Sequence, residues 1–184
     1  MKSPFRYQAS ETDCFPTTII NALTYLFPMN KISGELIKMV YCSSLDDFDK
    51  KGRIQGTKSN TSLENLHRFV PCRINILKSE DVNLDKIEDC LEKDGVAICS
   101  IYDIEKEGHS VLVIKCDSKW VHTWDPYPYT TKQISKHSRV VLMGHNKPLR
   151  EANIKIIRKR FNSYEKKPFS LGEKDRDCCL LWRT

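Results

Sequence analysis

The N-terminal third of the chain carries apolar residues at the 3.6-residue period of amphipathic helices. In the strongest example, which begins near Cys14, one apolar face is formed by Ile19, Leu23, Leu26 and Phe27. Thr12 or Asp13 suits the N-cap position, and Pro16 fits the first turn, where its missing N–H costs nothing. The pattern therefore predicts a helix that begins near Cys14 and ends before Pro28.

Three further helices are expected. They cover residues 34–41, 63–70 and 84–94. Pro71 and Gly95 follow the last two and are typical of helix ends. Between the first two of these helices, residues 43–61 are polar and rich in turn residues, which predicts a surface loop.

Strand patterns dominate the remainder of the chain. Short runs rich in β-branched and aromatic residues are separated by turn residues and lie at 73–77, 96–102, 110–115, 119–124, 139–143 and 154–159. Such runs are typical of β-strands. Because helices come first and strands later, the sequence predicts an α+β fold and not alternating βαβ units.

The size and composition of the chain fit a single domain over residues 1–184. Of the 184 residues, 40% are hydrophobic and 29% are charged, which is enough for one sizeable core and too little to require a second. No run approaches about eighteen consecutive apolar residues, and the first residues lack the apolar stretch of a secretory signal. We therefore expect a cytoplasmic protein without a membrane partner.

Positive charge is concentrated near the C-terminus. Residues 1–143 contain 19 Lys and Arg against 19 Asp and Glu, whereas residues 144–184 contain 11 against 5. A basic segment can contact nucleic acid, anionic lipid or an acidic partner, although a solvated surface is the more common reason for such a bias. No nucleic-acid motif accompanies the charge. We therefore interpret the segment from about residue 144 as a basic C-terminal extension and do not expect nucleic acid as a partner.

The cysteines do not form a pattern of disulfide or metal pairs. They are Cys14, Cys42, Cys72, Cys90, Cys99, Cys116, Cys178 and Cys179. None belongs to a CxxC motif, so most are expected to be reduced and buried. Cys178 and Cys179 precede the apolar run 180–182, which favours a terminal strand that docks its side chains over a disulfide between neighbours.

Cys14 lies where helix chemistry favours a nucleophilic thiolate. In the first turn of the predicted helix, unpaired backbone N–H groups and the helix dipole stabilise negative charge, and a nearby His would complete the activation. Attack on a carbonyl also needs donors for the oxyanion that develops. The backbone N–H of Cys14 and the side-chain amide of Gln8, six residues upstream, can supply them.

His109 is the best candidate for the base among the five histidines. It follows Gly108 and opens an almost continuously apolar strand. The next strand ends at Asp125, which is followed by Pro126. A carboxylate beside the imidazole would fix its tautomer and stabilise the imidazolium, so Cys14, His109 and Asp125 form a candidate triad.

The two strands predict a hairpin with a register that can be checked. Side chains alternate faces along a strand, so His109 and Asp125 share a face only if residue 111, and not 110, lies opposite residue 125. A three-residue loop at 117–119 or a bulge gives this register, whereas a two-residue turn at 117–118 does not. We predict the register that makes His109 and Asp125 diagonal neighbours.

These residues together resemble the papain-like cysteine peptidases, most closely the group related to double-glycine leader (bacteriocin-processing) peptidases. In that group a Gln, an Asp-Cys pair on a helix, a Gly-His strand and an Asp-Pro pair recur in this order. The matching residues are Gln8, Asp13, Cys14, Pro16, Thr17, Gly108, His109, Asp125 and Pro126. One departure is Phe15, because relatives usually carry Gly directly after the Cys and this bulky residue can narrow the cleft.

The resemblance implies a papain-like fold, in which an N-terminal helical half packs on an antiparallel sheet. It implies that Cys14 is the nucleophile and that His109 is the general base and then the general acid. Gln8 would be the oxyanion-hole residue and Asp125 the orienting residue.

The expected function is cleavage of peptide or amide bonds in a peptide or protein substrate through a thioester, with no metal or organic cofactor. Deamidation of Gln and transfer of the acyl group to an amine use the same catalytic set, so both stay open. A binding module that keeps the fold without turnover also stays open. The sequence indicates no particular oligomeric state.

Overall fold

A computed structural model describes residues 5–44, 47–48, 50, 54–55, 61–144, 151–172 and 177–184. Its helical elements are α1 (Cys14–Leu26), η1 (Met29–Lys31), α2 (Gly34–Ser44), α3 (Thr61–Asn65), η2 (Leu66–Arg68), η3 (Ser79–Asp81), α4 (Leu84–Glu92), α5 (Thr131–Ile134) and α6 (Arg158–Phe161), where η denotes a 3₁₀ turn. Its strands are β1 (Asp47–Phe48), β2 (Ile54–Gln55), β3 (Cys72–Lys78), β4 (Val96–Tyr102), β5 (Gly108–Cys116), β6 (Trp120–Trp124), β7 (Val140–Leu142), β8 (Ile154–Ile157) and β9 (Asp177–Arg183).

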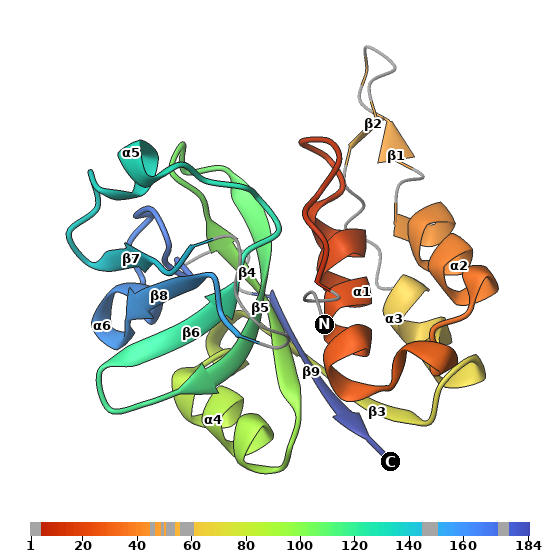
Figure 1. Cartoon of the computed structure of the whole chain (residues 1–184). Helices are drawn as coiled ribbons and strands as arrows, with labels where there is room; N and C mark the ends of the chain where they lie inside the picture. The colour runs from red at the N-terminus through yellow and green to blue at the C-terminus, as the bar shows by residue number, and fades with distance from the viewer. Residues whose placement is uncertain are drawn as a thin grey trace.

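Seven of these strands form one antiparallel sheet. Its order is β3-β9-β4-β5-β6-β8-β7, and α1, α2 and α3 lie beside it in Figure 1. The fold is therefore α+β, with helices in the N-terminal part, as the sequence predicts. β1 and β2 pair separately, and most of the predicted surface loop 43–61 lies outside the described residues.

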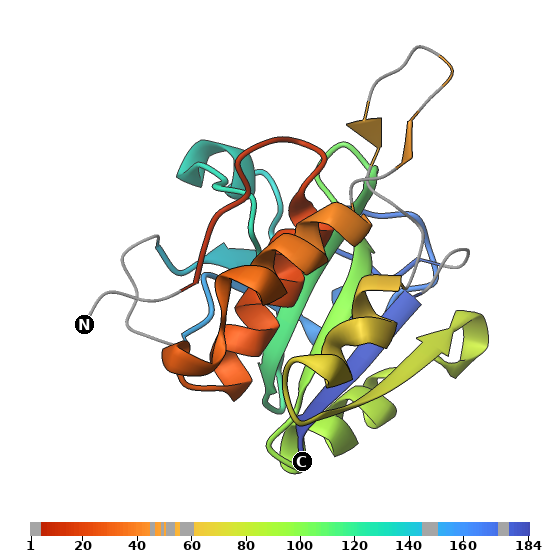
Figure 2. The same ribbon diagram turned by 90° about the vertical axis from the view of Figure 1, so that its right-hand side faces the viewer.

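α1 begins and ends where the sequence predicts. Asp13 is the N-cap residue, Phe27 is extended, and Pro28 follows. The predicted apolar face is buried, and Ile19 and Leu23 are fully inaccessible. α1 packs against β4, β5 and β9, and together with α2 and α3 it covers one face of the sheet (Figure 2).

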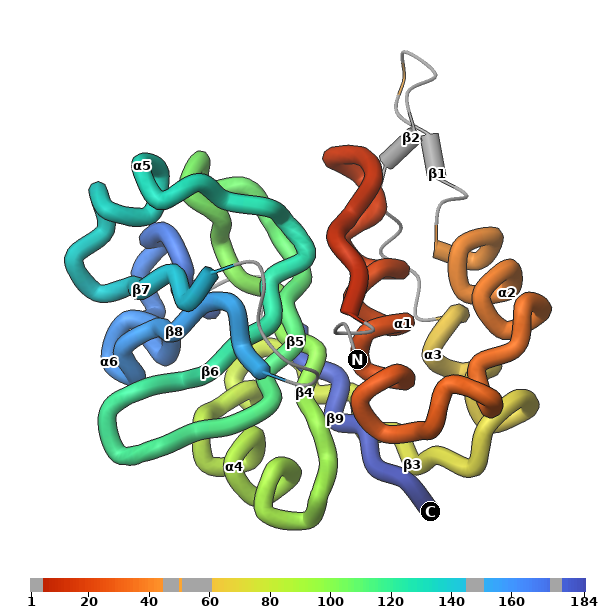
Figure 3. Tube along the Cα trace, viewed as in Figure 1, coloured from red at the N-terminus to blue at the C-terminus, as the bar shows by residue number. Residues whose placement is uncertain are grey.

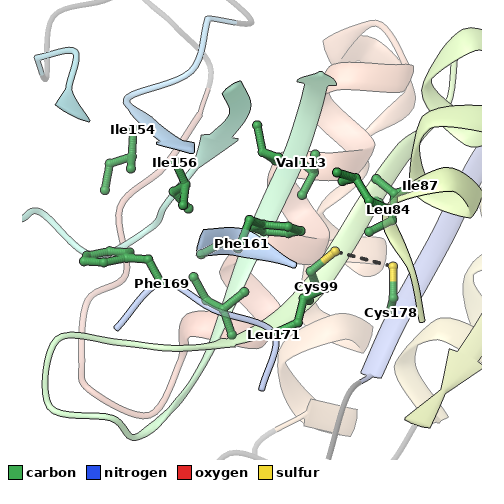
Figure 4. Packing of buried hydrophobic residues seen from close by; sticks show 14 of the residues in the cluster. Leu84, Ile87, Cys99, Val113, Ile154, Ile156, Phe161, Phe169, Leu171 and Cys178 are labelled. Atoms are coloured by element: carbon green, nitrogen blue, oxygen red, sulfur yellow. Dashed lines mark hydrogen bonds between the residues drawn. The ribbon is translucent and has the colours of Figure 1, made fainter. Parts of the chain in front are cut away.

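The opposite face of the sheet is covered by α4 and by the chain around α6. In β4, Ile98 joins the apolar cluster on the α1 side, whereas Cys99 joins the cluster on the α4 side. Figure 4 shows this second cluster, to which α4 contributes Ile87 and the C-terminal part of the chain contributes Phe161 and Phe169. A strand buried on both faces is expected to be a continuous apolar run, and residues 96–101 are mostly of this kind.

Residues 144–184, expected to be a basic C-terminal extension, contribute two strands to the sheet. β8 lies between β6 and β7, and β9 is an interior strand between β3 and β4 (Figure 3). Ile154 and Ile156 are buried, as are all four residues of 178–181. The strand predicted at 154–159 and the docked strand predicted at 178–182 correspond to β8 and β9, so the basic segment takes part in the core through the buried apolar side chains of these two strands.

All eight cysteines are free thiols. Four of them are buried, so the expectation that most are buried holds for only half. The sulfur atoms of Cys99 and Cys178, on neighbouring strands, lie 3.4 Å apart as a hydrogen-bonded thiol pair (Figure 4). The docked strand predicted for 178–182 is confirmed. Among the described helices, none has the length and apolar character that crossing a membrane requires.

Candidate active site

A shared hydroxyl fixes the start of α1 against the start of β5. Thr18 Oγ1 lies 2.7 Å from the carbonyl oxygen of Cys14 and 3.0 Å from that of Ser110. Thr18 is fully buried, so its hydroxyl has no exchange with bulk water to weaken these bonds. The result is that Cys14 lies beside the residues that open β5.

His109 is the second residue of β5, and it pairs with Asp125. His109 Nε2 lies 2.7 Å from Asp125 Oδ1, and the exposed fractions of the two side chains are 7% and 1%. Oδ1 of Asp125 also accepts the backbone N–H of Tyr127 at 2.9 Å. The carboxylate is therefore held by its own turn while it binds the imidazole.

The register of β5 and β6 matches the prediction near the site, through a bulge and not through a longer loop. Lys115 lies opposite His122, whereas Val113 lies opposite Thr123, so Ile114 is an extra residue in β5. The turn itself has two residues, since the N–H of Asp117 bonds the carbonyl of Trp120 at 2.9 Å. Beyond the bulge, residue 112 lies opposite 124, which brings 111 opposite 125 and puts His109 on the same face as Asp125.

Cys14 and His109 form a coupled pair in which each stabilises the charge of the other. Burial raises the pKa of the Cys14 thiol, but the hydrogen bond and positive charge of His109 and the bonds from Ser110 outweigh it, so that the pKa is lowered from its ordinary value. For His109, burial lowers the pKa. The charge and hydrogen bond of Asp125, and after them those of Cys14, outweigh burial and raise the pKa to about 10. Because Asp125 occupies Nε2, Nδ1 is the ring nitrogen left for the thiol. A thiolate and an imidazolium are thus favoured together.

The other thiols with a resolved shift behave in the opposite way. Burial raises the pKa of Cys72, and it raises the pKa of Cys90 and of Cys116 to about 12. Cys14 is also half-buried and not sealed in the core. It combines access with a stabilised thiolate, which is the combination that a nucleophile needs.

Gln8 lies next to the end of β6, but its side chain is held by its own loop. Its backbone N–H donates to the carbonyl of Pro126 at 3.0 Å, which places the N-terminal segment across the Asp125 corner. Its amide Nε2 donates to the carbonyl of Ser10 at 2.8 Å. The structure therefore brings Cys14, His109 and Asp125 into one group and places Gln8 beside that group, with one amide hydrogen already in use.

Asp13 organises the loop that joins Gln8 to Cys14, a role that sequence reasoning missed. Its buried carboxylate accepts the backbone N–H of Ala9 at 3.0 Å and that of Ser10 at 2.8 Å. It makes no side-chain cap bond to a backbone N–H of α1, and its one side-chain bond to the helix, from the hydroxyl of Thr17, is long at 3.5 Å; the carboxylate therefore mainly satisfies the preceding loop. An Asp directly before the Cys at a helix start was the available signal.

Phe15 packs toward the helical layer. It is half-buried and contacts the apolar cluster on the α1 side of the sheet. At least part of its bulk is therefore accommodated in that cluster. Across the described residues, no group of three His, Cys, Asp or Glu side chains is arranged to hold a metal ion.

Comparison of the chain with protein-family models, with curated proteins and with solved structures finds no match. The resemblance to papain-like peptidases therefore depends on the candidate site residues themselves and on the geometry in which they lie.

Proposed function

We propose that this protein is a papain-like cysteine peptidase or a closely related amide hydrolase, with Cys14 as nucleophile, His109 as base and acid, and Asp125 as orienting residue. The observation that carries the proposal is geometric: the thiol of Cys14 at a helix start is hydrogen-bonded to His109, which a buried carboxylate holds at 2.7 Å. Nucleophile, base and orienter are the three groups that thiol-dependent acyl transfer requires.

In the first half of the reaction, the Cys14 thiolate attacks the carbonyl carbon of an amide and forms a tetrahedral intermediate. His109 then gives its proton to the leaving nitrogen, the C–N bond breaks and a thioester remains. In the second half, His109 accepts a proton from water while the hydroxide attacks the thioester. The acid leaves and the thiolate is restored, so no external oxidant or cofactor is consumed.

Two donors are available for the oxyanion. Cys14 is the first residue of α1, so its backbone N–H has no acceptor within the helix. Gln8 Nε2 has a second hydrogen beyond the one given to Ser10. In the proposed mechanism this second hydrogen of Gln8 is given to the oxyanion once substrate is bound, since apo catalytic hydrogen bonds often tighten only in the complex.

The proposal is tested by alkylation of Cys14 with iodoacetamide, followed by mass spectrometry of the peptide that contains it. At about pH 5.5 an ordinary thiol of pKa about 8.5 is roughly one-thousandth ionised, whereas an activated thiolate reacts at once. We expect Cys14 to react at least about tenfold faster than the exposed thiol of Cys42, and His109→Ala to abolish the difference. Equal rates in the unmodified protein would refute an activated nucleophile.

The fate of the thioester decides between the related activities. Incubation with an unfolded protein substrate and an added primary amine, with Cys14→Ala as the matched control, yields three distinguishable masses. A cut chain indicates hydrolysis of the backbone, a Gln-to-Glu change indicates deamidation, and an amine adduct indicates acyl transfer. An activated thiolate that yields none of these with any unfolded substrate would favour a binding module.

A further inference from the structure

We infer that Asn153 is a positioning residue for the triad, which acts by holding the backbone of Asp125. Asn153 Oδ1 accepts the N–H of Asp125 at 2.8 Å, and Asn153 Nδ2 donates to the carbonyl of Asp125 at 2.8 Å. The side chain thus satisfies both backbone groups of the one residue that orients His109. The inference rests on the proposed function, because it assigns Asn153 a part in the same site.

The place of Asn153 in the sheet explains why it can do this. β6 and β8 pair with Thr123 opposite Ile154, and the N–H of Asn153 donates to the carbonyl of Thr123 at 3.1 Å. The regular ladder ends there, because Asp125 has left β6. The amide side chain of Asn153 presents a donor and an acceptor side by side, as a strand backbone does, and so extends the ladder by one residue.

Burial makes this pairing specific to an amide. The exposed fractions of Asn153 and Asp125 are both 1%, so a lost bond would leave a backbone group without water to replace it. The amide of Asn153 also bonds the phenol of Tyr7, which joins the N-terminal segment to the same point. An aliphatic residue of similar size offers none of these bonds, and a carboxylate lacks the donor for the carbonyl of Asp125.

The consequence for chemistry follows from the direction of the Asp125 side chain. Its Oδ1 is fixed by His109 and by the N–H of Tyr127, and its backbone is fixed by Asn153. Release of the backbone would let the carboxylate move relative to the imidazole of His109. Among the groups that raise the pKa of His109, this carboxylate has the largest effect. Loss of Asn153 is therefore expected to change the ionisation of Cys14, three contacts away through Asp125 and His109, and not only the stability of the fold.

The test measures the pH profile of Cys14 alkylation in Asn153→Ala, with Asn83→Ala as the matched control. Asn83 also uses its side chain to bond a backbone N–H, that of Lys86 at 3.0 Å, but it does so at the start of α4. For N153A we expect a fall of at least about tenfold in the rate at pH 5.5 and less than about twofold at pH 9, where an ordinary thiol is also mostly ionised. For N83A we expect a lower melting temperature with an unchanged profile.

The outcomes separate the two proposals. If the unmodified protein shows no fast reaction at pH 5.5, the proposed function and the role of Asn153 both fail. If it does react fast and N153A has the same profile as N83A, only the positioning role is overturned. Should N153A not fold, Asn153→Ser keeps one hydroxyl at the position and is expected to give a smaller loss of the alkylation rate at pH 5.5. An unchanged pH profile in N153S would overturn the inference. Fast hydrogen exchange of the Asp125 amide in the unmodified protein would also overturn it.

Discussion

Replacing Asp125 by Asn would remove the negative charge beside His109 while it keeps the shape of the side chain and an oxygen for the N–H of Tyr127. The experiment is best done with Cys14→Ser in both proteins, because the Cys14 thiolate also titrates and also stabilises the imidazolium. In that background, the difference in the free energy of unfolding between the protein with Asp125 and the protein with Asp125→Asn measures only the interaction of this carboxylate with the imidazole of His109.

The size of the effect can be worked out from the pKa of His109, which is about 10 against an ordinary 6.5. This pKa difference of about 3.5 corresponds to at most about 5 kcal/mol, at about 1.4 kcal/mol for each pKa unit, and part of it belongs to Cys14. A raised folded-state pKa stabilises the fold fully below the unfolded pKa of about 6.5, and this stability is lost as the pH rises through the folded pKa. We therefore expect D125N to lower the free energy of unfolding by roughly 2–4 kcal/mol at pH 6 and by progressively less toward pH 10.

The assay is urea unfolding of both proteins at several pH values from 6 to 10, with the difference between them plotted against pH. Asp117→Asn is the matched control, because Asp117 Oδ2 also lies 2.7 Å from a histidine, His122, but does so near the surface. Solvent screens that pair, so D117N is expected to give a much weaker dependence on pH. If the loss in the free energy of unfolding caused by D125N stays constant or grows with pH, the coupling of His109 to Asp125 is contradicted.

Three further substitutions test the surroundings of the site. Thr18→Val, which keeps the shape but removes the hydroxyl that bonds Ser110, is expected to cost about 1–2 kcal/mol in urea unfolding and to slow alkylation of Cys14 at pH 5.5. Asp13→Ala removes the acceptor of two loop N–H groups and is expected to cost about 2–3 kcal/mol, with faster proteolysis of residues 8–13; an unchanged digestion rate would contradict its role. Gly172→Ala introduces a Cβ at a φ of +70° that would overlap the ring of Tyr102, so thermal unfolding should show a loss of more than about 2 kcal/mol.

The elements that carry the site could be predicted because their signals are local. α1 follows from a helical period, a capping residue and a terminating proline within one short segment, and its position fixes Cys14 at a helix start. The sequence predicts the third helix less well, since residues 63–70 divide into the end of α3 and the 3₁₀ turn η2. Leu63, Leu66 and Val70 are buried as the helical period predicts, so the period identifies the buried face but not the change from α-helix to 3₁₀ turn.

The support for the triad could not be predicted because it comes from residues far apart in the chain. Asn153 bonds Asp125 across 28 positions, and nothing in its neighbours marks it as different from a surface amide. The interior position of β9 is likewise set by long-range pairing with β3 and β4. Net charge suggests that residues 144–184 are an extension, whereas the buried side chains of that segment decide where it lies.

The bulge at Ile114 shows how a local feature and a long-range requirement meet. The two-residue turn between Asp117 and Trp120 is a short connection that suits the twist of paired strands, but continued without interruption it would bring residue 112 opposite 125. Asp125 would then face away from His109, because a shift of one residue exchanges the two faces of a strand. The extra residue in β5 restores the pairing of 111 with 125, and so allows a tight turn and a shared face for the two triad residues in one hairpin.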